Sequence, residues 1–380
     1  MEKLSSLKFI LLLPLLGFLN SSLAQIKNTP FQHFKEFSEQ DSSKLFFRFE
    51  NFNFVKNNEY NSDFTDGVTW IGYIATPKMV YYPTSNFRIE AGARFQKYSG
   101  REDFTETEPI FSAIYHASDK IDFILGTLNQ DHNHKLSEPI FEPERFFSDN
   151  AENGFQILYH SDRFNLDTWI NWEKFILAND PFQERFTFGL SSDWQLNKLS
   201  SKNKFSIPVQ TVVTHRGGEI DSSDGSVQTV GNYSAGLQFT RKVENSRITS
   251  WTLKVMAHYF SDNSSEKEFI FDKGHAFYPQ FGFTTKQSQL HVGYWNAYQF
   301  AASRGSELFQ SVSFNNPGFF ENRRELATLN YFYEHEIAKG INLGGKLDAY
   351  YDLKNSKENF AAAIYLQING DFFLKKIKWN

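Results

Sequence analysis

The feature that most constrains this sequence is a two-residue alternation of apolar and polar side chains, which recurs in segments of about ten residues. The clearest segment, residues 251–259, places Trp251, Leu253 and Val255 on one face and Lys254 and His258 on the other. Successive side chains of a β-strand point to opposite faces, so such a segment has one apolar and one polar face. The pattern predicts an all-β chain.

About sixteen alternating segments follow residue 43, an even number that is typical of bacterial transmembrane barrels. They are 45–54, 67–82, 86–98, 108–116, 120–128, 154–160, 164–172, 185–196, 205–215, 227–240, 251–259, 269–283, 288–297, 328–334, 342–352 and 360–372. Charged or amide residues interrupt every apolar run after residue 43, so none of these runs has the length of a membrane-spanning helix. The strands themselves are therefore expected to cross the membrane.

The connections between these segments alternate in length. Short polar turns follow the even-numbered segments, at 83–85, 118–119, 161–162, 198–202, 244–245, 285–286 and 338–340. Longer connections follow odd-numbered segments, at 56–66, 99–107, 129–153, 174–182, 216–225 and 300–323. Short periplasmic turns and long external loops have this arrangement in outer-membrane barrels, whereas a soluble sandwich has no reason to adopt it. We predict a transmembrane antiparallel up-and-down β-barrel of about sixteen strands.

The N-terminus has the pattern of a secretory signal. Lys3 and Lys8 precede the apolar run 9–19, and Ser22 and Ala24 supply small residues before a cleavage site. The predicted organisation is a signal peptide at 1–24, a periplasmic N-terminal segment at 25–42 and a transmembrane barrel at 43–380. Export of a barrel implies the outer membrane of a Gram-negative bacterium.

Composition supports the barrel and excludes several other classes. The chain has 42 Phe, 17 Tyr and 7 Trp but a mean hydropathy of -0.48, which aromatic girdles around a polar lumen would explain. A soluble sandwich or jelly roll is the competing interpretation. The absence of cysteine excludes disulfides, a thiol nucleophile and lipoprotein acylation. The formal charge of -5 without a basic cluster predicts no nucleic-acid partner.

A barrel of about sixteen strands leaves an aqueous lumen. Charged residues that parity directs inward are candidates to line it, and they carry both signs. Such charges could orient polar solutes in a transverse field, or could pair across strands and hold the barrel's shape. The candidate lumen-lining residues are Arg88, Arg94, Asp122, Asp167, Arg185, Arg216, Lys254, Glu334, Lys346 and Asp348.

The connection at 129–153 combines charge with apolar side chains that would be costly in a solvated loop. Its candidate constriction or partner-binding residues are Ile140, Phe141, Arg145, Phe146 and Phe147. We expect this loop to fold onto the barrel mouth, as a constriction, a partner site or an ordered cap.

His132, His134 and Glu138 in the same connection could share a divalent cation, but the signal is weak without cysteine or a repeated acidic motif. We predict no metal and no other cofactor. The remaining histidines are scattered over separate strands, and no G-x-S-x-G or other nucleophile motif accompanies them. The sequence therefore predicts that the protein is not an enzyme.

Several segments carry a family resemblance. Tyr294-Trp295-Asn296, the run 308–313 (LFQSVS) and the closing run 371–376 (DFFLKK), with the signal and the alternating strands, resemble porin-like outer-membrane barrels of Bacteroidota, a family that is largely uncharacterised. The resemblance implies location and fold, and no functional residue is carried over from it.

Two functions remain open, a porin-like channel for passive diffusion of small polar solutes and a non-conducting subunit of an assembly, secretion or uptake complex. The expected partners are outer-membrane lipid and other outer-membrane or periplasmic proteins.

Overall fold

The computed structural model describes residues 37–198, 200–218 and 220–377, so the predicted signal peptide lies outside the described residues. The described residues form one closed sheet in which every strand pairs with its sequence neighbours, and β1 pairs with β16. All pairings are antiparallel. The predicted all-β, up-and-down barrel of about sixteen strands is therefore confirmed. None of the described helices is long and apolar enough to span a membrane.

The strands and helices have the following bounds. The first eight strands are β1 (Lys44–Tyr60), β2 (Thr69–Thr84), β3 (Phe87–Tyr98), β4 (Glu106–Ser118), β5 (Ile121–Thr127), β6 (Asn153–His160), β7 (Phe164–Lys174) and β8 (Arg185–Gln195). The others are β9 (Asn203–Arg216), β10 (Gln228–Lys242), β11 (Ile248–Asp262), β12 (Lys273–Thr285), β13 (Ser288–Tyr298), β14 (Arg323–Ala338), β15 (Ile341–Asp352) and β16 (Lys357–Lys376). Short helices are η1 (Glu39–Asp41), η2 (Asp131–Lys135), α1 (Arg145–Ser148) and η3 (Glu307–Phe309).

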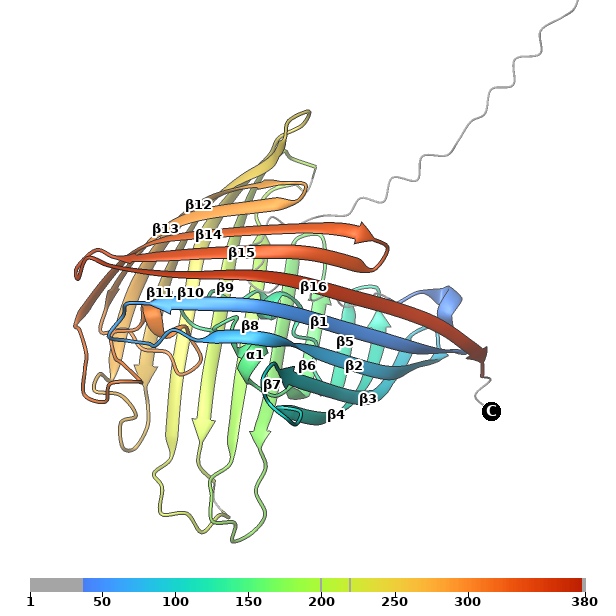
Figure 1. Ribbon diagram of the computed structural model, residues 1–380, viewed down its shortest axis with the longest axis horizontal. Coiled ribbons are helices and arrows are strands. Elements are labelled where there is room, and N and C mark those ends of the chain that lie inside the picture. Colours follow the sequence, from blue (N-terminus) through green and yellow to red (C-terminus); the bar gives the residue numbers. More distant parts are fainter. Residues whose placement is uncertain (1–36, 199, 219, 378–380) are drawn as a thin grey trace, which may run out of the picture.

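Closure of the barrel joins the two ends of the described chain. β1 lies beside β16, with Lys44 opposite Lys376 and Tyr60 opposite Asn359, and Figure 1 shows the blue and red strands side by side. Closure leaves no unpaired strand edge, which is what a sheet in a bilayer requires.

Several strand boundaries differ from the sequence prediction, among them those of β1 and β12. β1 continues to Tyr60, although the connection was expected from residue 56. β12 begins at Lys273, so Phe269 and Phe271 belong to a loop instead of the predicted strand. The carboxylate of Asp262 accepts the backbone N–H groups of Glu268 and Phe269 at 2.7 and 3.2 Å, which turns the chain here and buries both phenylalanines.

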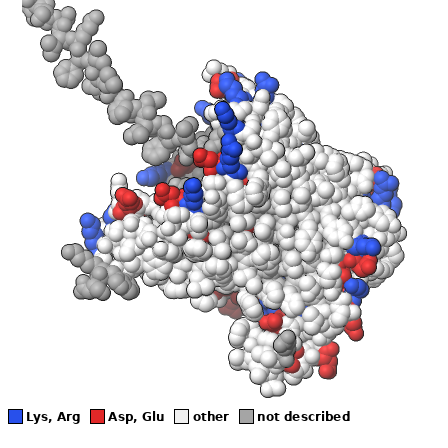
Figure 2. All heavy atoms as spheres, turned by 180° about the vertical axis from the view of Figure 1, so that it is seen from behind, with Lys and Arg blue, Asp and Glu red and all other residues white. Residues whose placement is uncertain are grey.

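The outer face of the barrel is an apolar belt. Leu237, Leu253, Leu347 and Ile364 point outward and are 65%, 46%, 52% and 64% exposed. Figure 2 shows one side of the molecule almost free of charge along the strands, with Lys, Arg, Asp and Glu gathered toward its edges. Exposed apolar side chains on every strand fit a lipid-facing surface.

Two long connections fold into the lumen, and we call them the first inner loop (residues 128–152) and the second inner loop (residues 299–322). Ile140 and Phe141 of the first loop and Phe300 and Phe309 of the second are buried in one cluster with inward strand residues such as Trp295. The loops also bond each other, through Glu142 N to Arg304 O at 2.7 Å and Ser306 N to Glu138 O at 3.0 Å. The barrel therefore has a packed core inside its long-loop end.

Candidate functional site in the barrel lumen

Three larger cavities remain in the lumen around the packed loops. The inner cavity, of about 230 Å³, lies between β1–β5, β16 and the first inner loop. The outer vestibule, of about 690 Å³, opens among the long loops, and the short-turn vestibule, of about 650 Å³, lies at the opposite end. Gln130, Phe146 and Ala151 line both the inner cavity and the outer vestibule, so these two spaces are neighbours.

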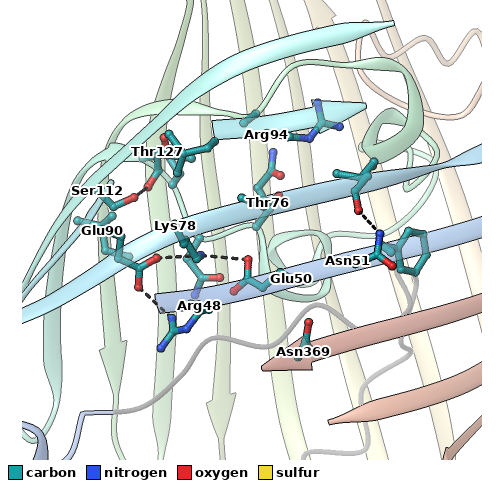
Figure 3. Close-up of a pocket in the computed structure, with 18 of the residues that line it drawn as sticks. Arg48, Glu50, Asn51, Thr76, Lys78, Glu90, Arg94, Ser112, Thr127 and Asn369 are labelled. Carbon is teal, nitrogen blue, oxygen red and sulfur yellow. Dashed lines mark hydrogen bonds and ion pairs between the residues drawn. The ribbon is translucent and has the colours of Figure 1, made fainter. Parts of the chain in front are cut away.

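The inner cavity contains a network of alternating charges. Glu90 on β3 bonds Lys78 of β2 at 2.8 Å, Arg88 at 2.9 Å and Arg48 of β1 at 3.1 Å. Figure 3 shows Arg48, Lys78 and Glu90 converging from three neighbouring strands. Even-numbered residues of β1, β2 and β3 point inward, which is why these side chains meet.

Glu50 is the more accessible carboxylate of this cavity. Its side chain is 35% exposed and bonds Lys78 at 3.0 Å, whereas the Glu90 side chain is 7% exposed between three cations. A carboxylate with solvent access can accept a proton from water, and nearby guanidinium and ammonium groups can stabilise a developing oxyanion. The hydroxyl of Ser112 donates to the Thr127 carbonyl at 2.6 Å, and no imidazole lines the cavity in the described part of the chain.

Two asparagines interrupt the apolar belt beside this cavity. Asn51 and Asn53 lie on the outward face of β1, where Asn51 Nδ2 donates to Ile74 O at 3.2 Å and Asn53 Nδ2 donates to Asn51 Oδ1 at 2.5 Å. Asn51 also lines the inner cavity. Polar side chains on a lipid face are costly and therefore indicate a functional or contact surface.

The first inner loop is held in the lumen by a buried ion cluster. His134 is fully buried, stacks on Trp169 with ring centroids 3.7 Å apart, and bonds Asp167 at 2.9 Å and Glu152 at 2.6 Å. Burial alone would lower the pKa of His134, but the charges of Asp167 and Glu152 outweigh it and raise the pKa to about 10. His134 is thus a cationic clamp and not a general base, because it is already protonated at neutral pH.

The structure places most predicted lumen-lining residues in the barrel interior. Arg88, Arg94, Asp122, Asp167, Lys254, Lys346 and Asp348 are all buried on inward faces, while Glu334 is half-buried at the short-turn vestibule. Arg185 and Arg216 point inward but are exposed at the rim of the long-loop end. Of these ten residues, Arg88 and Arg94 line the inner cavity and the others do not, so the predicted charges do not line one continuous cavity among the described residues.

The candidate loop residues are brought to two places. Ile140 and Phe141 join the core with Trp169 and Trp295, whereas Phe147, with Phe146 beside it, packs against Phe52 and Tyr365. Arg145 pairs with Asp149 and lines the outer vestibule. Glu138 accepts a hydrogen bond from Tyr350 at 2.6 Å, and the side chain of His132 lies outside the described residues.

A serine and a histidine also meet inside the wall. Ser234 Oγ lies 2.6 Å from His258 Nδ1, and both residues are buried. Trp295 and Phe300 cover the imidazole, with ring centroids at 5.3 and 6.2 Å. The pair lines none of the described cavities, and no carboxylate orients its imidazole among the described contacts.

Sequence reasoning missed the inner cavity, although its signal was present. Arg48, Glu50 and Lys78 occupy alternate, inward positions of β1 and β2, so their parity alone predicts that they face the lumen. The second inner loop, at 300–323 one of the two longest connections, was a candidate to constrict or close the bore, but its packing on Trp295 could not be read from the sequence.

Comparison with known proteins identifies a family and a fold. The sequence matches the Lipid A 3'-O-deacylase-type family over residues 37–377. The structure resembles a loop L8 deletion mutant of OmpT, an outer membrane protein of Vibrio cholerae, with TM-score 0.51 and 10% identity over 85% of this chain and 99% of that one. It also resembles the outer membrane protein OprD from Pseudomonas aeruginosa, with TM-score 0.51 and 11% identity over 88% and 96% of the two chains. No curated protein matches the sequence.

These findings confirm a porin-like barrel fold of the kind found in these outer-membrane proteins. They contradict the prediction that the protein is not an enzyme, because the matching family is named for a deacylase. That prediction relied on short contiguous motifs, whereas a barrel assembles its polar groups from neighbouring strands, one or two residues from each.

Proposed function

Because the chain belongs to the Lipid A 3'-O-deacylase-type family, we propose that it hydrolyses the ester that links the 3'-O-acyl chain to lipid A or a closely related outer-leaflet glycolipid. Water would be consumed, and the products would be a free fatty acid and a glycolipid with a free hydroxyl. The observation that carries this proposal is the family match, which spans the described barrel from its first strand to its last.

The inner cavity is the proposed site of hydrolysis. Its lining combines an accessible carboxylate, Glu50, with the cationic groups of Arg48, Lys78 and Arg94. Asn51 belongs both to this lining and to the outward face of β1, so the cavity borders the surface that an outer-leaflet lipid would contact.

Each group would have a distinct role. Glu50 would accept a proton from the attacking water, and its partner Lys78 would hold its carboxylate in place. Arg94 would stabilise negative charge on the ester oxygen or a nearby phosphate, since guanidinium groups bind such oxyanions well. The second inner loop and Trp295 belong to the buried apolar core inside the long-loop end, and this core would exclude water from that part of the lumen.

The test is mass spectrometry of lipid A incubated with the folded protein in detergent micelles. Wild type is expected to release one acyl chain, and Glu50→Gln to slow release by about 10²-fold, the usual contribution of a general base. Glu334→Gln is the matched control, because Glu334 lines the short-turn vestibule instead. If wild type releases no acyl chain, the function is refuted, and if Glu50→Gln and Glu334→Gln behave alike, the assignment of the site is refuted.

A second candidate function, passive diffusion of small polar solutes, is favoured by the polar linings of the vestibules at the two ends. Apart from Phe332, every residue that lines the short-turn vestibule is polar or charged. Single-channel conductance of purified protein tests it. Steps of conductance would support diffusion, and a silent bilayer with correctly folded protein would refute it.

A further inference from the structure

A small cavity at the rim of the long-loop end is lined by three arginines. It measures about 160 Å³, and Arg185, Arg216 and Arg304 face it together with Thr214, His215, Gln228, Glu268 and Ser303. We call it the arginine pocket. Arg185 and Arg304 also line the outer vestibule, so the pocket is accessible from the space between the long loops.

Two of the arginines are forced together by strand register. Arg185 of β8 lies directly opposite Arg216 of β9, and both point inward by parity. Like charges directly opposite each other on adjacent strands are destabilising. Within the described part of the chain neither guanidinium has an ion pair, and Glu268, which lines the same pocket, is the carboxylate whose charge acts on both.

The third arginine is fixed in place. Arg304 of the second inner loop pairs with Glu173 and donates Nε to Thr187 Oγ1 at 3.2 Å. Its carboxylate partner lies on the side of the outer vestibule, since Glu173 lines that space and not the arginine pocket. Arg304 therefore presents a guanidinium of defined orientation.

The other polar groups of the pocket neutralise it only in part, because three arginines face one carboxylate. Glu268 is the one carboxylate among the described residues that line it. Burial raises the pKa of Glu268, although Arg216, Arg304 and Arg185 act to lower it. The hydroxyl oxygen of Ser303 is buried without a hydrogen-bond partner among the described residues, so a donor is available for a ligand oxygen.

We propose that the arginine pocket binds a phosphate group of the glycolipid headgroup. Arginine forks match phosphate oxygens, and one dianionic phosphate would neutralise the opposed pair Arg185 and Arg216. His215, which lies on the outward face of β9, also lines the pocket, so the site borders the rim where headgroups of the outer leaflet lie. The assignment to a lipid rests on the proposed function, whereas phosphate recognition rests on the pocket alone.

The test compares binding of three probes to purified protein in detergent micelles, namely lipid A, lipid A from which phosphatase has removed the phosphates, and inorganic phosphate. Wild type is expected to bind phosphorylated lipid A about tenfold or more tightly than the dephosphorylated form. The double variant Arg185→Gln, Arg216→Gln is expected to lose that difference. Arg241→Gln, an exposed arginine at the short-turn end, is the control and should retain it.

Every outcome decides the proposal. If the double variant binds all probes like Arg241→Gln, the arginine pocket is not a phosphate site. If inorganic phosphate binds as tightly as lipid A and only the double variant loses it, the ligand is a dissolved phosphate and the lipid assignment is overturned. Should the double variant fail to fold, Arg185→Lys with Arg216→Lys keeps both charges, and an intermediate loss is expected because the forked geometry is gone.

The experiment tests phosphate binding by the arginine pocket separately from hydrolysis at the inner cavity. Acyl release measured on the same preparations reports on the inner cavity. Phosphate-dependent binding without acyl release would refute the proposed reaction and leave the arginine pocket standing, whereas acyl release without phosphate dependence would do the reverse.

Discussion

The two halves of the lumen are built from the same strands but differ in what fills them. On β11, Ser250, Thr252 and Lys254 point inward near the short turns, whereas Met256 and Phe260 point inward near the long loops. β13 likewise changes from Gln289 and His291 to Trp295 and Ala297. On these two strands the inward face thus changes from polar to apolar, and the inner loops pack on the apolar part.

This difference shows that the lumen of a barrel can carry a core in one half and a solvated chamber in the other. The apolar half buries residues from both inner loops against Trp169, Trp295 and Tyr350. The polar half retains the short-turn vestibule of about 650 Å³. Removal of side chains should therefore be costly in the first half and nearly free in the second.

The largest expected effect comes from removing the first inner loop. Deletion of residues 134–147 removes four buried apolar side chains, Leu136, Ile140, Phe141 and Phe147, each of which contributes about 1.5–3 kcal/mol by burial. We expect a lower temperature for the heat-modifiable gel shift and a higher ion conductance than that of the wild type, because a constriction of the lumen has been removed. Replacing residues 101–104, an exposed stretch between β3 and β4, is the control. An unchanged conductance would show that the second inner loop alone closes the barrel.

The next effect tests the core directly. Trp295→Ala removes a fully buried indole that packs on Phe300 and Phe309 and donates Nε1 to Phe309 O at 3.0 Å. The expected loss of unfolding free energy is about 3–5 kcal/mol. Gln238→Ala, at an inward position of the short-turn vestibule, should lose no more than about 0.5 kcal/mol. Equal losses in denaturant titrations would contradict the division into two halves.

A third substitution pair separates the lumen from the lipid face. Leu237 points outward and is 65% exposed, whereas its neighbour Gln238 points inward. Leu237→Arg should cost about 2–4 kcal/mol near mid-membrane, since lipid cannot solvate the charge, and Gln238→Arg should cost little. Both are measured by reversible unfolding from lipid vesicles.

Alternation and loop length were enough to predict the barrel, because both are local properties of the sequence. Inward direction was also predictable, as for Lys254 and Asp348. The site was not, since its contacts join distant positions. His134 meets Asp167, 33 residues away, and Arg48 meets Asp371, 323 residues away, only after the strands have closed. Such pairs do not appear in any contiguous sequence motif. For the same reason, the search for contiguous motifs wrongly predicted that the protein is not an enzyme.

The smallest expected effect is a pH response confined to the apolar half. His134 has an ordinary pKa of 6.5 that is raised to about 10, so its protonated form is favoured by docking of the first inner loop. The contribution of protonated His134 to the stability of the docked loop is fully present below pH 6.5, declines between pH 6.5 and 10, and is lost above pH 10. Burial, only partly opposed by Lys346, raises the pKa of Glu138 to about 7, and this carboxyl also weakens docking as the pH rises.

Fluorescence of Trp169 reports this change, because an imidazolium stacked on an indole quenches it more strongly than a neutral imidazole does. We expect emission to rise with pH, with a midpoint near 10, and Trp169→Phe should remove the signal. His134→Gln should abolish the transition, because no proton is lost at that position. His335→Gln, at the short-turn end where Gln287 bonds the imidazole at 2.7 Å, should leave it unchanged. If the pH-dependent change in Trp169 emission persists in His134→Gln, a group other than His134 titrates in the first inner loop. The pH response would then not be explained by the buried ion cluster of the apolar half.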